Sequence, residues 1–269
     1  MTLVTYRPMP SNLLVVDVGN TNIVLGIYRG GELSNSWRLA TARDRTSDEY
    51  GILAKQLVAE SQPAKLDGAI VSSVVPPLNH SVQAMIEKYF GVEPLFVEPG
   101  VKTGIAIHVD NPQEVGADRI VNAVAAHAAH GGPVIIVDFG TATTFDVVTA
   151  DARYVGGVIA PGINISAEAL FARASRLPRV EIRRPATVVG TNTVVNMQSG
   201  LYFGYLGLVD GILARIKREV PGVKRVIATG GLATLFESDS EHIDETDSEL
   251  TLKGLKIIWD RNRGGRRGR

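Results

Sequence analysis

The chain has 269 residues, of which 45% are hydrophobic and 21% charged, enough for one large or two ordinary globular domains. Its 28 basic and 28 acidic residues cancel, which argues against a dedicated nucleic-acid binder, and the absence of cysteine excludes disulfides and Cys-ligated zinc. No apolar run approaches the ~20 residues of a membrane helix and the N-terminus has no secretory-signal pattern, so we expect a cytoplasmic protein without a membrane partner.

The first half of the chain is predicted to open with an antiparallel meander and to continue with helices and strands in alternation. Residues 1–12 have two prolines and no hydrophobic period, so they are predicted to be an extension. The predicted strands are 13–17, 22–28, 32–39, 66–75 and 95–97, and the predicted helices are 47–61, with Ser47 as its N-cap, and 80–90.

The second half repeats this alternation after a loop at 101–115. Strands are predicted at 133–138, 143–148, 153–159 and 223–228, and helices at 117–130, 163–174 and 193–220, the last broken near Gly200 to Gly207. Residues 237–249 are polar and predict a surface loop before a last regular segment at 250–259. The basic stretch 261–269 predicts a disordered tail.

One pattern occurs twice, about a domain length apart. LLVVDVGNTN begins at Leu13 and VIIVDFGTAT at Val134; in each, an apolar strand ends in Asp, a Gly follows two positions later, and Thr comes within the next two. The Gly lets the turn bend and brings backbone N–H groups close to an oxyanion, while the Asp can hold a cation that neutralises phosphate charge. The repeat predicts a duplicated domain with phosphate-binding hairpins at Asp17 and Asp138; a purely structural β-turn is the alternative.

From Leu13 to about Trp259 the chain resembles the type III pantothenate kinases, in the acetate and sugar kinase/Hsp70/actin superfamily. The segments that carry the resemblance are DVGNTN from Asp17, DNP from Asp110, GADR from Gly116, DFGTATT from Asp138, GGVIAPG from Gly156, GTNTVVNMQSG from Gly190 and TGG from Thr229. The resemblance implies an α/β fold of two RNase H-like (actin-like ATPase) domains with mixed sheets and the active site in the interdomain cleft. The domains would be 13–125 and 126–260.

The implied activity is ATP-dependent phosphorylation of pantothenate to 4′-phosphopantothenate, the first step of coenzyme A biosynthesis. The implied cofactors are ATP, Mg²⁺ and a monovalent cation, K⁺ or NH₄⁺, and the implied assembly is a homodimer. Two alternatives stay open: another small-molecule kinase, such as a sugar kinase, and a non-catalytic nucleotide-binding accessory protein of transcription. GADR argues against the first, and the presence of Asp17, Asp118 and Asp138 together argues against the second.

The resemblance also assigns roles to residues. Asp118, at a helix start where free N–H groups favour anions, would be the catalytic base; a first-turn helix stabiliser is the alternative. Arg119 would clamp the pantothenate carboxylate or the transferring phosphoryl group. Contacts with ATP are implied for Asp17, which would also bind Mg²⁺ directly or through water, and for Val18, Gly19, Asn20, Thr21, Asn22, Thr141, Gly230 and Gly231.

The remaining implied roles concern the second cation and the acceptor substrate. Asp138 would bind the monovalent cation. Pantothenate contacts are implied for Gly116, Ala117, Asp118, Arg119 and Thr193, and the alternative for Thr193 is a helix N-cap. One position departs from the family pattern: Val109 stands before DNP, where many relatives have an aromatic residue over the substrate. Val109 is therefore counted among the implied pantothenate-binding residues, with a smaller side chain at that edge of the substrate.

Overall fold

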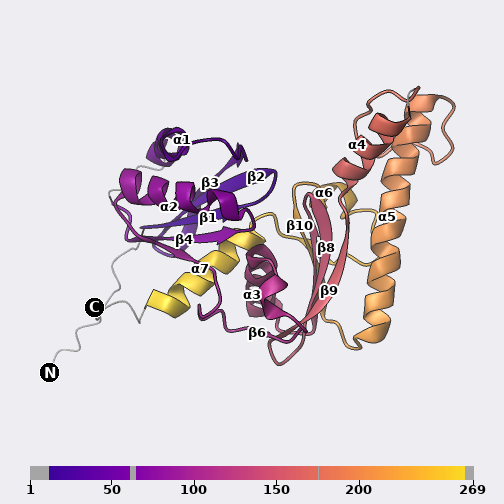
Figure 1. Cartoon of the computed structure of the whole chain (residues 1–269). Helices are drawn as coiled ribbons and strands as arrows, with labels where there is room; N and C mark the ends of the chain where they lie inside the picture. The colour runs from indigo at the N-terminus through magenta and orange to yellow at the C-terminus, as the bar shows by residue number, and fades with distance from the viewer. Residues whose placement is uncertain (1–11, 61–64, 175, 264–269) are drawn as a thin grey trace. The chain divides into compact units, whose positions relative to one another are not determined.

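The computed structural model describes residues 12–60, 65–174 and 176–263 (Figure 1). The chain divides into two compact units. Of the described residues, the first unit contains those up to Gly104, Gln113–Val124 and those from Thr251 to Arg263, and the second contains those within Ile105–Pro112 and Ala125–Leu250. The segment 105–112 and the described residues from Thr251 onward lie in the other unit from the one predicted.

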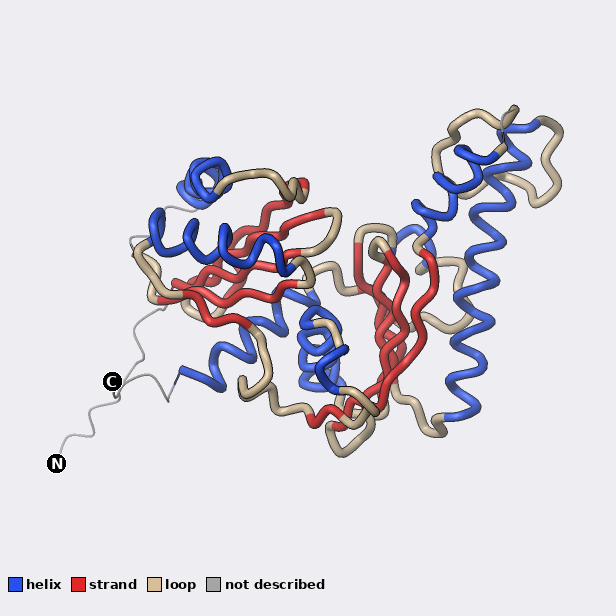
Figure 2. Tube along the Cα trace, viewed as in Figure 1, coloured by secondary structure: helices blue, strands red, loops and turns tan. Residues whose placement is uncertain are grey.

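The first unit is built on a five-stranded mixed sheet. Strands β1 (Asn12–Val18), β2 (Asn22–Arg29) and β3 (Glu32–Ala40) form an antiparallel meander, and β4 (Gly68–Ser73) and β5 (Pro94–Phe96) join it in parallel, in the order β3-β2-β1-β4-β5. Helices α1 (Ser47–Glu60) and α2 (Pro76–Phe90) lie side by side on this unit (Figure 2). An apolar cluster that includes Val16, Val71 and Ile86 fills the space between these helices and the sheet.

The opposite face of this sheet is covered by α7 (Leu250–Asn262), which itself packs against α3 (Ala117–His130). Two glycines make room for α7: a Cβ on Gly68 would lie 2.1 Å from the Trp259 ring, and one on Gly26 would lie 3.1 Å from Leu252. Gly254 of α7 packs as closely on α3, since its Cβ would lie 2.1 Å from the carbonyl oxygen of Val121. These contacts are the reason that the end of the chain belongs to the first unit.

The second unit repeats the arrangement with one added edge strand. Its sheet has the order β11-β10-β7-β8-β9-β6, formed by β6 (Ala106–Ile107), β7 (Val134–Phe139), β8 (Ala142–Val148), β9 (Arg153–Pro161), β10 (Arg225–Gly230) and β11 (Glu245–Thr246). The other elements are a 3₁₀ turn (Pro112–Glu114), α4 (Ile163–Arg173), α5 (Thr193–Glu219) and α6 (Ala233–Phe236). Tyr202 and Tyr205 of α5 and Phe236 of α6 pack with Phe139 of the sheet.

The two sheets confirm the predicted duplication. Without β6, both have a three-stranded antiparallel meander whose first strand then pairs in parallel with a fourth. Both meanders have a register shift at the equivalent place, between Ile27 and Tyr28 and between Val147 and Val148. This is the strand order of RNase H-like domains, so the predicted α/β fold with mixed sheets is confirmed.

Three local predictions were wrong. Helix α5 is continuous through Gly200 to Gly207. A Cβ on Gly200, Gly204 or Gly207 would meet nothing within 4 Å, so these glycines face open space and do not mark a break. Helix α2 begins at Pro76, since proline fits the first helical turn, where no N–H is required. The final helix extends through residues 261 and 262, which were predicted to be part of the disordered tail; 264–269 and 1–11 lie outside the described residues.

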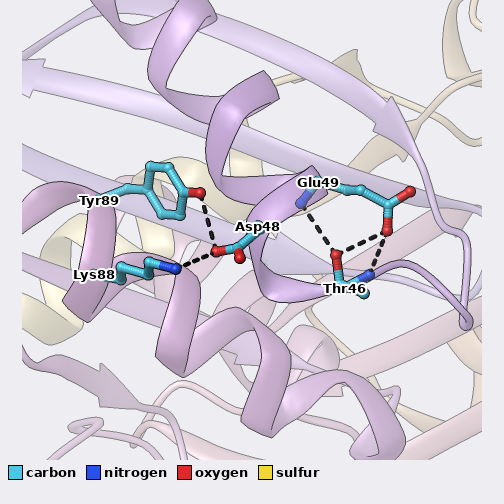
Figure 3. A network of polar contacts seen from close by, with 5 residues as sticks. All are labelled: Thr46, Asp48, Glu49, Lys88 and Tyr89. Atoms are coloured by element: carbon cyan, nitrogen blue, oxygen red, sulfur yellow. Dashed lines mark hydrogen bonds and ion pairs between the residues drawn. The ribbon is translucent and has the colours of Figure 1, made fainter.

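The N-cap of α1 is Thr46 and not Ser47 (Figure 3). The Thr46 hydroxyl accepts a hydrogen bond from Glu49 N (3.3 Å), and Glu49 Oε2 accepts one from Thr46 N (2.8 Å), which is a capping box. Asp48 ties α1 to α2 because its Oδ1 accepts hydrogen bonds from Lys88 Nζ (2.7 Å) and the Tyr89 hydroxyl (3.0 Å). The bond from Lys88 and then that from Tyr89 lower the pKa of Asp48.

None of the helices in the described part of the chain combines the length and the apolar character that a membrane span requires.

Candidate active site

The first hairpin forms a tight turn at the carboxyl end of β1. Gly19 N donates a hydrogen bond to Asn22 O (2.9 Å), and a Cβ on Gly19 would lie only 3.0 Å from that oxygen. Asp17 comes two residues earlier; it is half-buried and its Oδ1 is shielded from solvent. Asn20 and Thr21 are exposed. The turn thus presents polar side chains and backbone next to a carboxylate, which is the arrangement expected of a phosphate cradle.

Two residues that sequence analysis missed brace this turn. The Thr41 hydroxyl donates to Gly19 O (2.7 Å), and Thr41 N donates to Thr21 O (2.9 Å). Arg43 Nη2 donates to Asn20 Oδ1 (3.2 Å) and so places a positive charge beside the turn. Both residues follow β3 in the polar segment TARDR. Its two arginines are the sequence feature that could have indicated a positive charge near the phosphate turn. Their contact with the hairpin depends on the β2–β3 pairing, in which Asn22 lies opposite Ala40.

The start of α3 lies at the same edge of the first unit. Val74 N, just after β4, donates to Val18 O (3.0 Å) at the end of β1. A Cβ on Gly116 would lie 3.3 Å from Val74 Cγ1, so Gly116 is close to both strand ends. Asn122 anchors the helix, because its Oδ1 accepts a hydrogen bond from the Thr251 hydroxyl of α7 (2.7 Å). The structure therefore brings the segment Gly116–Arg119 to the edge where the Asp17 turn lies.

Asp118 is held in a defined position at the start of α3. Its Oδ1 accepts a hydrogen bond from Arg119 N (2.7 Å), one of the N–H groups at the helix terminus. A Cβ on Gly116 would lie 2.5 Å from this same oxygen, so a side chain at 116 would displace the carboxylate from the position that the bond with Arg119 N defines. Asp118 and Arg119 are both half-buried. A half-buried carboxylate with one oxygen fixed by the helix terminus is suited to accept a proton from a bound hydroxyl.

The predicted residues of the second hairpin lie together in the second unit. Asp138 is half-buried near the end of β7, and Gly230 on the neighbouring strand has φ 91° and would place a Cβ 2.6 Å from Asp138 Oδ1. Gly140 N donates to Ala142 O (3.1 Å), so this turn is one residue shorter than that at Gly19. Thr141 is exposed, and its carbonyl accepts from Gly162 N (3.1 Å). Gly231 follows Gly230 directly and precedes α6.

Thr193 and Val109 lie on other parts of the second unit. Thr193 is the exposed first residue of α5, and the N-cap is Asn192, whose Oδ1 accepts from Val195 N (3.0 Å). The alternative that Thr193 is the N-cap is therefore wrong. A cavity of about 420 Å³ lies beside this helix start and includes Arg183, Arg184, Gly190 and Thr191. Val109 follows β6, within 3.8 Å of the position of a Cβ on Gly156.

Comparison with known proteins gives a family match over most of the chain. Residues 13–215 match the family model described as type III pantothenate kinase. The type III pantothenate kinase of Koribacter versatilis is 56% identical over 269 residues, covering 96% of this chain and 98% of that protein. The type III pantothenate kinase of Myxococcus xanthus is 56% identical over 252 residues, covering 93% and 98%.

Solved structures resemble the chain at lower identity. A protein described as a Baf family transcriptional activator from Campylobacter jejuni superposes with a TM-score of 0.60 at 20% identity, over 93% of this chain and 99% of that one. The ethanolamine utilization protein EutJ from Carboxydothermus hydrogenoformans gives 0.53 at 15% identity, over 94% and 92%. At these identities the likeness concerns the fold alone.

Proposed function

The chain belongs to the type III pantothenate kinases, and from this premise we propose how its residues divide the reaction. The enzyme transfers a phosphoryl group from ATP to pantothenate and produces ADP and 4′-phosphopantothenate in coenzyme A biosynthesis. The observation that carries the assignment of residues is that the Asp17 turn and the start of α3, with Asp118, lie at one edge of the first unit.

The Asp17 turn is suited to the phosphates of ATP. Backbone groups around Gly19 and the side chains of Asn20, Thr21 and Asn22 supply donors, and Val18 continues the strand into the turn. Among the described residues no group of three His, Asp or Glu side chains could hold a metal ion, and Asp17 is the residue that would hold Mg²⁺ here. When bound, Mg²⁺ neutralises charge on the phosphates.

Asp118 is the proposed general base. The pantothenate hydroxyl oxygen forms a bond to the γ-phosphorus as the bond from that phosphorus to the ADP oxygen breaks, and the hydroxyl proton moves to Asp118. The N–H groups of Ala117 and its neighbours at the start of α3 favour an anion, and the Arg119 guanidinium would bind the pantothenate carboxylate or the transferring phosphoryl group. Most of the rate acceleration would come from positioning and charge neutralisation.

The second unit would supply the remaining contacts. A half-buried carboxylate at Asp138, next to the backbone of a tight turn, is suited to a weakly bound monovalent cation, K⁺ or NH₄⁺. Thr141 in that turn would contact phosphate. Gly230 and Gly231 would let the chain approach adenine and ribose closely. Thr193 at the exposed start of α5 would contact pantothenate, and Val109 would replace the aromatic contact found in many relatives.

A homodimer in the cytoplasm is also proposed. Support for an interface on the second unit comes from large apolar side chains that are exposed on or near its helices α4 and α5: Ile165, Leu170, Val188, Val189 and Val194. Exposed apolar side chains that gather in one region are typical of protein interfaces. Sedimentation velocity distinguishes the expected dimer from a monomer.

The proposed function predicts that release of ADP requires both pantothenate and a monovalent cation of suitable size. In a coupled ADP-release assay we expect turnover with pantothenate in potassium or ammonium buffer, and a much lower rate in buffer with sodium alone. Sugars tested in place of pantothenate serve as controls. Absence of pantothenate-dependent ADP release would contradict the proposed reaction, and equal rates in sodium and potassium would contradict the role of Asp138.

A further inference from the structure

Ser72 in β4 has a buried hydroxyl that makes no hydrogen bond with the described residues. The residue is 0% exposed, and its Oγ has no hydrogen-bond partner within the part of the chain that the structure describes. Buried hydroxyls are nearly always hydrogen-bonded, and an unmade bond costs stability. A bound ligand could supply the hydrogen-bond partner that this hydroxyl lacks.

The register of the sheet places Ser72 beside Asp17. Strands β1 and β4 are parallel, with Asp17 opposite Ser72. Adjacent strand residues in register point to the same face, so both side chains are on one face of the sheet. The neighbouring positions Val71 and Val16 belong to the apolar cluster beneath α1 and α2, which leaves Ser72 and Asp17 on the face that α7 covers.

The next residue, Ser73, shows what a satisfied hydroxyl in this strand looks like. Its Oγ donates to Asn79 Oδ1 (2.6 Å) and accepts from Val75 N (3.2 Å), so it holds the turn from β4 into α2. Ser73 points to the opposite face from Ser72, as strand alternation requires. The two neighbouring serines therefore differ in their hydrogen bonds: the Ser73 hydroxyl has partners, and the Ser72 hydroxyl has none among the described residues.

Ser72 also lies close to the start of α3. Val74, two residues further on, contacts Gly116 and is hydrogen-bonded to Val18. The Ser72 hydroxyl is thus at the edge where the proposed phosphate turn and Asp118 meet. A hydroxyl next to a carboxylate, at the end of parallel strands, can hydrogen-bond a phosphate oxygen or a water on a bound cation.

We propose that Ser72 is a further binding residue of the phosphoryl-transfer site, whose hydroxyl donates a hydrogen bond to an oxygen of the metal-bound nucleotide held at Asp17. The inference rests on the proposed function, because it requires the nucleotide to bind at the Asp17 turn. It assigns to Ser72 of β4 a role that neither the hairpin motif nor GADR includes.

The test compares Ser72→Ala with Ser73→Ala in the full-length protein by thermal unfolding and by calorimetric titration with Mg·ADP. We expect Ser72→Ala to unfold at or above the wild-type temperature without ligand, because it deletes a buried hydroxyl for which the described residues supply no hydrogen-bond partner. Its Kd for Mg·ADP should rise about tenfold, the usual loss for a hydrogen bond to a charged group. Ser73→Ala should unfold at a lower temperature and retain the wild-type Kd.

An unchanged Kd in Ser72→Ala, whatever its unfolding temperature, would overturn the role of Ser72 while leaving the proposed function in place. Failure of the wild-type protein to bind Mg·ADP would overturn the proposed function and, with it, this inference. The two failures are distinguishable because the first is seen in the variant alone and the second in the wild type.

Discussion

Replacing Asp118 with Asn is expected to lower turnover about 100-fold or more, the usual scale for loss of a general base, and to leave ATP binding nearly intact. Asparagine has the same shape, and its side-chain oxygen can still accept the hydrogen bond that Arg119 N donates to Asp118 Oδ1 (2.7 Å). The helix start should therefore keep its structure while the group that accepts the proton is lost. The kcat at saturating pantothenate and the Kd for ATP measure the two effects separately.

A matched control is Asp48→Asn, which neutralises an exposed carboxylate on α1 of the same unit. It removes the ionic contact with Lys88 and should leave kcat unchanged. Full turnover by Asp118→Asn at saturating substrate would contradict the role of Asp118 as the base. An equal fall of kcat in both variants would show that the effect comes from charge in general rather than from proton transfer.

Replacing Gly230 with Ala is expected to destabilise the protein strongly. The residue has φ 91°, where an L side chain costs about 1–2 kcal/mol. The added Cβ would lie 2.6 Å from Asp138 Oδ1 and 2.7 Å from Phe139 N, and overpacking of this kind costs a further ~1–3 kcal/mol. Chemical denaturation should show the loss of stability, and the assay should show a higher potassium requirement, because the Asp138 carboxylate has to move.

Gly207→Ala is the control for this variant. Gly207 lies inside α5, where a Cβ would meet nothing within 4 Å. Alanine there should stabilise the helix by about 0.5–1 kcal/mol, since glycine is a poor helix former. A Gly230→Ala protein as stable as the wild type would contradict the close packing of β10 against Asp138.

Much of the fold was predictable because its signals are local. The apolar strands that end at Asp17 and Asp138, and the turns at Gly19 and Gly140, are short-range patterns, and they predicted both hairpins and the duplication that the sheets confirm. The helix that begins at Ala117 was predicted with its correct bounds for the same reason. Identification of the family rested on short segments such as GADR, in which the order of residues carries the information.

The failures concern features that depend on what surrounds a residue. A glycine in α5 can break a helix or simply face open space, and only packing distinguishes the two for Gly200 and Gly207. Thr46, and not the predicted Ser47, is the N-cap of α1 because its hydroxyl and its N–H both form hydrogen bonds with Glu49. Both outcomes follow from contacts that sequence spacing alone does not specify.

By itself, the sequence determined the turns at Gly19 and Gly140 and the helix that begins at Ala117, because turns and helix starts depend on local residue order. The reaction class came from the family resemblance that these segments carry. The tertiary structure decided which of these meet. It placed Gly116 against Val74, Ser72 in register with Asp17, and the last helix against α3 through Gly254. Contacts between segments far apart in the chain are set by strand register and by the closeness that a missing Cβ permits, and neither quantity can be read from residue order.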